Sequence, residues 1–141
     1  MLSLTACEDK LELVDPQLIG NEVALTNDKN VKLVLTGAYD VLSGADMYGG
    51  LVMLNSELLA ANDEIVFSGT YNEPDEIFNK SISTSNGDVS NLWAGAYRTI
   101  NMANNVLSAL NVVNEADRDQ VEGEALFLRG VSYFELVRFF G

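Results

Sequence analysis

The sequence contains no histidine, a single cysteine and only eight lysine and arginine residues among 141. Because histidine is the commonest general base near neutral pH, any catalysis would have to use carboxylates, tyrosine or lysine. One cysteine excludes an internal disulfide and a cysteine-based zinc site. No run of roughly 18 or more apolar residues is present, so the sequence predicts no membrane-spanning helix.

The charge balance is strongly acidic. Twenty-one aspartate and glutamate residues against eight basic ones give a formal net charge of -13 and a pI near 4.1. Such a surface repels nucleic-acid phosphates and anionic lipids, so we expect no nucleic-acid partner. The length of 141 residues and the hydrophobic content of 48% fit one globular domain with a buried core.

Apolar residues recur at helical spacing in four segments of the chain. Helices are predicted over residues 28–43, 50–61, 89–110 and from 115 onward. Helix caps are predicted at Thr26 or Asn27, at Asp88 and at Asn114. Residues 62–87 lose this periodicity and predict a long irregular loop, which is functional or carries short strands.

Two helix faces are predicted to lie in the core. The third helix carries a heptad track that includes the single tryptophan. Its members are Val89, Trp93, Ala96, Ile100, Ala103, Leu107 and Leu110. In the last helix apolar residues fall on three sides, which predicts neighbours on more than one flank and a buried Phe134. Gly123 and Gly130 share a face two turns apart, where close approach of another helix is expected.

The short connection before Glu115 predicts that the last two helices run antiparallel. Two helix hairpins separated by a loop predict an all-α fold. The predicted type is an α-solenoid of tetratricopeptide repeats with a long irregular loop. The repeats are called degenerate because no strict repeat of about 34 residues is present. Arg129 is expected to pair with a carboxylate or with helix-end carbonyls, and Asn104 and Asn105 to form a hydrogen-bonded lock between helices.

Three blocks of the sequence resemble a known family. The last block holds Glu124-Ala125, Phe127-Leu128-Arg129, Tyr133-Phe134, Leu136-Val137-Arg138 and Phe140-Gly141. The earlier blocks hold Gly37-Ala38-Tyr39 with Leu42, and Leu92-Trp93 through Tyr97, Ile100, Asn104 and Leu107. Their order is similar to that of the SusD/RagB family, surface lipoproteins of outer-membrane nutrient uptake in Bacteroidetes. The resemblance implies a scaffold of irregular helical repeats.

The N-terminus carries a lipidation signal. Leu4-Thr5-Ala6-Cys7 has the order of a bacterial lipobox, and Glu8-Asp9-Lys10 resembles the charged export tag of surface lipoproteins. We therefore expect lipidation at Cys7, although residues 1–6 are too short for a complete signal peptide. The expected organisation is a signal remnant at 1–7, an extended arm at 8–26 and, at 27–141, the N-terminal helical part of a SusD-like domain whose continuation is missing.

Candidate ligand-binding residues lie between residues 62 and 87. Aromatic faces stack on sugar rings, and amides bond the neighbouring hydroxyls. Tyr71 and Asn72 are the predicted ligand-binding pair, whereas Phe67 and Phe78 fit slightly better as residues that pin the loop to the helices.

Two acidic clusters in the same stretch are weaker candidates. Residues 72–76 lack the spacing of a calcium loop and are interpreted as a solvated acidic turn. Asp63 and Glu64 invite a glycosidase hypothesis, but nothing in the sequence sets the distance between two catalytic acids. We therefore expect no metal, no cofactor and no catalytic residue.

The resemblance implies a protein that binds and does not catalyse. It implies capture of an oligosaccharide or other nutrient at the cell surface, by a lipid-anchored partner of a SusC-like, TonB-dependent outer-membrane transporter. The lipid would be the membrane attachment. The alternative is a helical-repeat module for protein-protein interaction without a nutrient site.

Overall fold

The computed structural model describes residues 24–61 and 65–141. Within these ranges all regular structure is helical, as the sequence predicted. The elements are α2 (Asp28–Ser43), α3 (Leu51–Ala60), α4 (Asn72–Phe78), α5 (Gly87–Ser108), the short 3₁₀ helix η2 (Leu110–Val112) and α6 (Glu115–Phe140). The predictions about Cys7, Asp63, Glu64 and most of the N-terminal arm lie outside the described residues.

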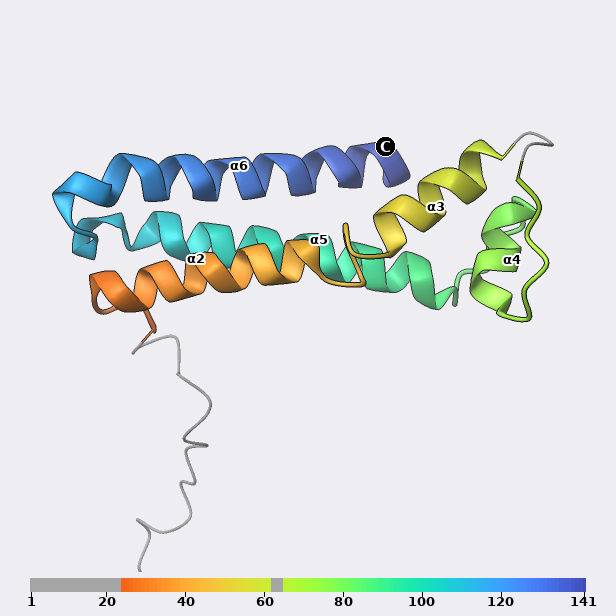
Figure 1. Cartoon of the computed structure of the whole chain (residues 1–141), viewed down its shortest axis with the longest axis horizontal. Helices are drawn as coiled ribbons and strands as arrows, with labels where there is room; N and C mark the ends of the chain where they lie inside the picture. The colour runs from red at the N-terminus through yellow and green to blue at the C-terminus, as the bar shows by residue number, and fades with distance from the viewer. Residues whose placement is uncertain (1–23, 62–64) are drawn as a thin grey trace, which may run out of the picture.

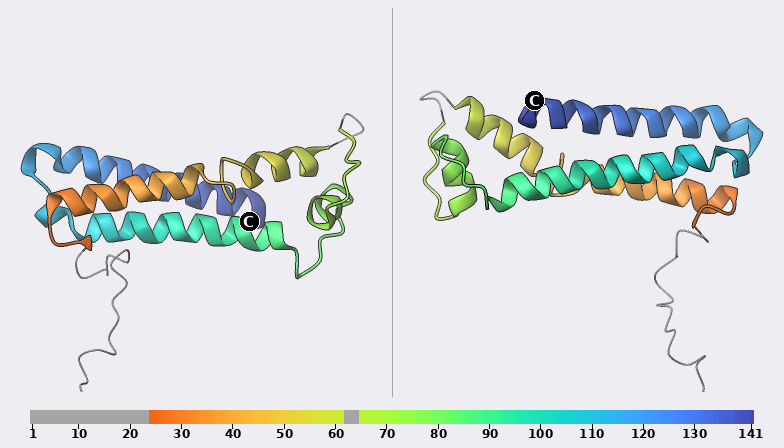
Figure 2. Two further views of the ribbon diagram at one scale, coloured as in Figure 1. Left: turned by 60° about the horizontal axis from the view of Figure 1, so that its bottom comes forward. Right: turned by 180° about the vertical axis from the view of Figure 1, so that it is seen from behind.

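Three long helices form the body of the molecule. Helices α2, α5 and α6 pack against one another side by side, and α5 and α6 run antiparallel as predicted (Figures 1 and 2). Helix α3 does not fold back along α2 as a hairpin partner but packs on α4 and α5 at one end of the body. The tetratricopeptide type of the repeat therefore stays a prediction.

The body is held together by a continuous apolar core. Its most buried members come from all three long helices and from the connection between α2 and α3. They include Val31, Leu35, Ala38, Met47, Leu92, Ala96, Ala103, Val106, Ala125 and Leu128. Each is at most 5% exposed, so truncation of the larger ones leaves a cavity.

The predicted core faces of α5 and α6 are wrong at Trp93 and Phe134, which are 46% and 60% exposed. Helix α5 lies between α2 and α6 and buries small residues on the interfaces, including Gly95 and Ala96. A Cβ on Gly95 would lie 3.0 Å from the Met47 side chain, so the elements approach too closely there for a large ring. Trp93, two residues away on another side of the helix, lies outside this close contact.

The glycines of α6 also differ from the prediction. A Cβ added to Gly123 or Gly130 would find nothing within 4 Å, so no helix of the described chain approaches them. The close approach instead occurs at Gly95 and at Gly37, where a Cβ would lie 2.8 Å from Met102 Cε. Gly123 and Gly130 leave an open face on α6.

The predicted long loop contains a helix. Helix α4 has seven residues, too few to show periodicity, and it starts with acidic residues and a proline that suit a helix N-terminus. Pro74 and Ile77 are buried, and the Glu76 carboxylate accepts hydrogen bonds from Asn86 and Ser83. The interpretation of residues 72–76 as a solvated acidic turn is therefore wrong, because these residues begin a helix that is anchored to the rest of the molecule.

The predicted helix N-caps are confirmed in part. Asn27 caps α2 by accepting a hydrogen bond from the Asn30 N–H at 3.0 Å, as expected. Helix α5 is capped by Asn86 rather than by Asp88, because the Asn86 amide also donates to the Glu73 carbonyl and so joins α4 to α5. Asn114 holds the cap position of α6 without a side-chain cap bond.

Candidate functional site

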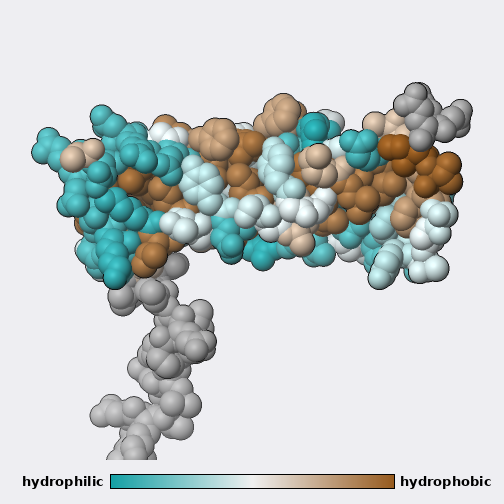
Figure 3. All heavy atoms as spheres, in the orientation of Figure 1, coloured by the Kyte–Doolittle hydropathy of each residue, from teal (hydrophilic) through white to brown (hydrophobic). Residues whose placement is uncertain are grey.

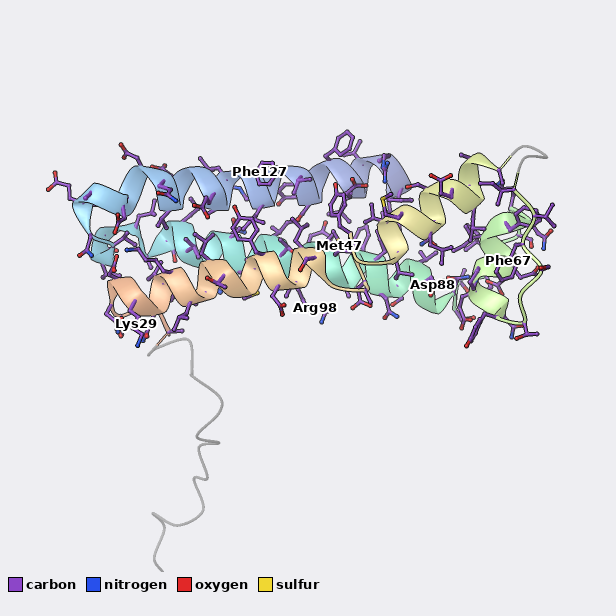
Figure 4. The ribbon with its side chains drawn as sticks, viewed as in Figure 1. Lys29, Met47, Phe67, Asp88, Arg98 and Phe127 are labelled. Carbon is purple, nitrogen blue, oxygen red and sulfur yellow. The ribbon has the colours of Figure 1, made fainter. Side chains whose placement is uncertain are left out.

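Tyr71 and Asn72 lie at the start of α4, at the end of the molecule opposite the α5–α6 turn. Tyr71 is 75% exposed, and Asn72 is exposed as well, so both are accessible to a ligand. Phe67 and Phe78 are only half-buried, and Phe67 lies beside α4 with its ring close to Gly69 (Figure 4). The loop aromatics thus divide into an exposed tyrosine and two partly packed phenylalanines.

An aromatic cluster that the sequence analysis missed lies on α5 and the end of α6. The Trp93 ring centroid is 4.9 Å from that of Tyr97 and 5.0 Å from that of Phe140, which meets it edge-on. The three rings are between 39% and 46% exposed. Exposed, mutually supported rings are suitable platforms for apolar faces of ligands. The four-residue spacing of Trp93 and Tyr97 on adjacent helix turns is the available signal, but the heptad track places Trp93 in the core.

Two concave surfaces lie away from Tyr71 and Asn72, the predicted ligand-binding pair. A cavity of about 130 Å³ lies among α3, the α4 region, α5 and the end of α6. It is lined by Asn55, Leu59, Ile77, Ile82, Val89, Leu92, Phe139 and Phe140. A more open groove of about 350 Å³ lies between α2 and α5, where its polar lining consists of asparagine amides.

Asn105 lines this groove, whereas Asn104 accepts a hydrogen bond from Arg129 at 3.0 Å. The interhelical lock is thus confirmed for Asn104. The expected carboxylate or helix-end carbonyl partner of Arg129 is wrong, because its guanidinium bonds the Asn104 side-chain amide oxygen instead.

A buried carboxylate fastens α6 to the α2–α3 region. Glu135 is 2% exposed and accepts a hydrogen bond from the Tyr48 hydroxyl at 2.5 Å. Its second oxygen forms an ion pair with Arg138 Nη2 at 2.8 Å, and the same nitrogen donates a hydrogen bond to Ser56 Oγ at 2.8 Å. Partial burial and the bond to Glu135 raise the pKa of Tyr48 to about 12. This cluster joins three segments that are far apart in the sequence.

The acidic residues do not gather into a metal site in the part of the chain that the structure describes. There, no group of three or more metal-ligating side chains comes together. Lys32 instead bridges Asp28 and Asp117, which ties the start of α2 to the start of α6. Among the described helices, none combines the length and the apolar character needed to cross a bilayer.

Comparison with known proteins places the chain in a family. The sequence model of the SusD-like family described as "Starch-binding associating with outer membrane" matches residues 14–141. SusD-like protein P2 of Formosa agariphila is 28% identical over the whole chain, which spans 28% of that relative's length. No solved structure gives a significant match. Because the family match covers nearly all of the sequence and agrees with the three residue blocks, this chain belongs to the SusD-like family.

Proposed function

We propose that this chain is part of a non-catalytic protein that captures an oligosaccharide at the cell surface. In this proposal a lipid anchors the protein to the outer membrane, where it serves a TonB-dependent, SusC-like transporter. The family match over residues 14–141 carries the proposal. The chain corresponds to about a quarter of the matching relative, so the activity belongs to the longer protein.

Tyr71 and Asn72 are the proposed sugar contacts. Their support is chemical: a ring that is 75% exposed stands next to an exposed amide, which supplies both the stacking surface and the hydrogen-bonding group that a sugar needs. Neither residue lines the two concave surfaces described above. A complete site therefore requires further groups that converge on this pair.

Removing the Tyr71 ring tests this assignment in the full-length protein. Tyr71→Ala should weaken oligosaccharide binding by about 1 kcal/mol, or about fivefold in Kd, because one stacking contact is lost. Titration calorimetry gives the value, with Tyr71→Phe as the matched control that keeps the ring. The isolated 141-residue chain should bind weakly or not at all. No effect of Tyr71→Ala would refute the assignment, whereas micromolar binding by the isolated chain would contradict the need for further groups and place the whole site within residues 62–87.

Cys7 is the proposed attachment point of the lipid. In cells that express the protein with a complete signal sequence, Cys7→Ala should move it from the membrane fraction to the soluble fraction, because no acyl chain can be added. Fractionation followed by immunoblotting measures the change, and Cys7→Ser is a second variant of similar size. Unchanged membrane partitioning of both variants would rule out this anchor.

The alternative is a module that binds another protein and no nutrient. One observation favours it, namely the exposed apolar residues along α6, among them Leu126, Phe127 and Phe134. Under this alternative Tyr71 is dispensable, so the Tyr71→Ala titration separates the two functions.

A further inference from the structure

The junction between α4 and α5 depends on one buried asparagine. Asn86 is 4% exposed and holds the N-cap position of α5, where its Oδ1 accepts a hydrogen bond from the Val89 N–H at 3.1 Å. Its Nδ2 donates to the Glu73 carbonyl oxygen at 3.1 Å and to Glu76 Oε2 at 2.9 Å. The side chain therefore serves two helices at once, because it caps α5 and holds α4 against it.

The sequence places a glycine directly after this asparagine. Asn86-Gly87 is the only asparagine-glycine pair in the chain. A following glycine favours spontaneous deamidation, because it has no Cβ to shield its amide nitrogen. In this reaction the Gly87 nitrogen loses its proton and attacks Asn86 Cγ, and Nδ2 leaves as ammonia. Water then opens the cyclic imide at one carbonyl to give aspartate, or at the other to give isoaspartate.

The folded structure opposes this reaction. To close the imide ring, the Asn86 side chain must turn onto the Gly87 nitrogen and break its hydrogen bonds to both helices. The main chain is held as well, since the Asn86 N–H donates to the Ser83 carbonyl and the Asn86 carbonyl accepts from the Ser90 N–H. The reaction therefore has to pass through a local opening of the α4–α5 junction.

Helix α4 is suited to such an opening. It has seven residues, of which Pro74 and Ile77 are buried, and it lies at one end of the molecule. Figure 3 shows polar residues beside hydrophobic ones on the surface of this end. Few buried apolar contacts and a place at the end of the molecule are features of segments with low local stability. We therefore expect α4 to open while the body of α2, α5 and α6 stays folded.

The fold does not require glycine at position 87. Gly87 does not have a positive φ. A Cβ added there would lie 3.8 Å from its nearest neighbours, which are side-chain atoms of Glu73, and this is an ordinary van der Waals distance. Alanine therefore fits at this position, so Gly87→Ala separates the reactivity of the pair from the fold.

The product of the reaction cannot restore the junction. Aspartate at position 86 still accepts the cap bond from Val89, but it has no donor for Glu73 or Glu76. Its new carboxylate oxygen takes the place of Nδ2, which lies 2.9 Å from the Glu76 carboxylate. The hydrogen bond from Asn86, followed by those from Ser83, lowers the pKa of Glu76, so this carboxylate is charged at neutral pH and repels the new one. Isoaspartate also adds a methylene group to the main chain.

We propose that Asn86-Gly87 is a spontaneous deamidation site that the α4–α5 junction protects, and that its reaction releases α4 from α5. The reaction consumes only water, and refolding does not reverse it because ammonia is lost. Tyr71 and Asn72 lie at the start of α4, so its release would also move the proposed sugar contacts. The deamidation itself does not depend on that assignment.

Mass spectrometry of peptides from the aged protein measures the reaction, because replacement of NH₂ by OH changes the mass of the peptide that holds Asn86. The protein is kept in mildly alkaline buffer, either folded or in guanidinium chloride. We expect deamidation of Asn86 to be at least about tenfold slower in the folded protein. Gly87→Ala should slow it by a similar factor in guanidinium chloride. Equal rates in the folded and unfolded protein would overturn the protection, and no effect of Gly87→Ala would overturn the site.

Glu76→Ala tests whether the junction controls the rate. It removes an acceptor of Asn86 but no reacting group, so the junction opens more often and the rate in the folded protein should rise at least about threefold. Asp75→Ala removes the same charge from an exposed position on α4 and should change the rate little. In guanidinium chloride both variants should react as the wild type does. An unchanged rate in folded Glu76→Ala would contradict control by the junction.

Asn86→Asp tests the consequence of the reaction. Hydrogen exchange measured by mass spectrometry should be at least about tenfold faster for the amides of α4 than in the wild type, while α6 keeps its rates. Asn91→Asp makes the same replacement at an exposed position on α5 and should leave α4 protected, as the matched control. Unchanged protection of α4 in Asn86→Asp would contradict the release of this helix.

Discussion

Replacing Glu135 by alanine is expected to lower the free energy of unfolding by about 2 to 4 kcal/mol. Hydrogen bonds to a charged group are worth about 1.5 to 3 kcal/mol, and the variant also leaves a void. It removes the acceptor of the Tyr48 hydroxyl and the ion partner of Arg138, and so unfastens α6 from the α2–α3 region. Urea unfolding followed by circular dichroism measures the loss.

Glu135→Gln is the matched control for this experiment. It keeps the volume and an acceptor for Tyr48, so it should cost about 1 kcal/mol. The pH dependence adds a second readout. Because folding raises the pKa of Tyr48 above its usual value of 10.0 to about 12, the stability linked to this group is complete below pH 10 and is lost toward pH 12. This loss of stability at alkaline pH should be smaller in Glu135→Gln. Equal, small costs for the alanine and glutamine variants would contradict the fastening role.

Replacing Leu128 by alanine is expected to cost about 2 to 5 kcal/mol, whereas the same change at its neighbour Phe127 should cost less than about 1 kcal/mol. Leu128 is 0% exposed in the core, while Phe127 is 60% exposed on the outer side of α6. The larger side chain thus gives the smaller effect. Chemical denaturation gives both values.

Leu92 and Trp93 provide the same comparison on α5. Leu92 is 1% exposed and Trp93 is 46% exposed, so Leu92→Ala should be the more damaging change. A larger loss for Trp93→Ala than for Leu92→Ala, together with a larger loss for Phe127→Ala than for Leu128→Ala, would show that the helix faces are assigned one residue out of phase.

Helix positions were predictable from the sequence because periodicity is local. The bounds of α2, α5 and α6 agree with the expected segments within a few residues, and the all-helical class is confirmed. Helix faces were less predictable. The heptad track of α5 names Ala96, Ile100 and Ala103 correctly, yet α5 packs against both α2 and α6 and buries a broader face of small residues. Only the packing partners determine that Trp93 falls outside it.

Tertiary interactions account for most of the remaining differences. Asn86 caps α5 because it also joins α4, a contact that no local pattern contains. Glu135 is buried because Tyr48 and Arg138 come together around it. Tyr48 is distant in the sequence, whereas Arg138 lies on the next turn of the same helix. Helix α4 is short and depends on buried Pro74 and Ile77 for its place. Such features follow from the assembled fold rather than from spacing.

The family was predictable for a different reason. Its signature is a set of residue blocks in a fixed order, and the resemblance over these blocks is confirmed by the family match over residues 14–141. The ligand contacts did not follow in the same way, because a sugar site is defined by convergence in space. Tyr71 and Asn72 therefore remain predictions, while the exposed Trp93 and Tyr97 add a second aromatic surface to consider.

The most direct test of non-catalytic oligosaccharide capture is one titration of the full-length protein with a panel of oligosaccharides, starch fragments included. Calorimetry measures binding, and chromatography of the recovered sugar measures cleavage. We predict saturable binding of at least one oligosaccharide, with the sugar recovered intact after prolonged incubation. Release of shorter products would contradict the non-catalytic assignment, and absence of binding across the panel would contradict oligosaccharide capture.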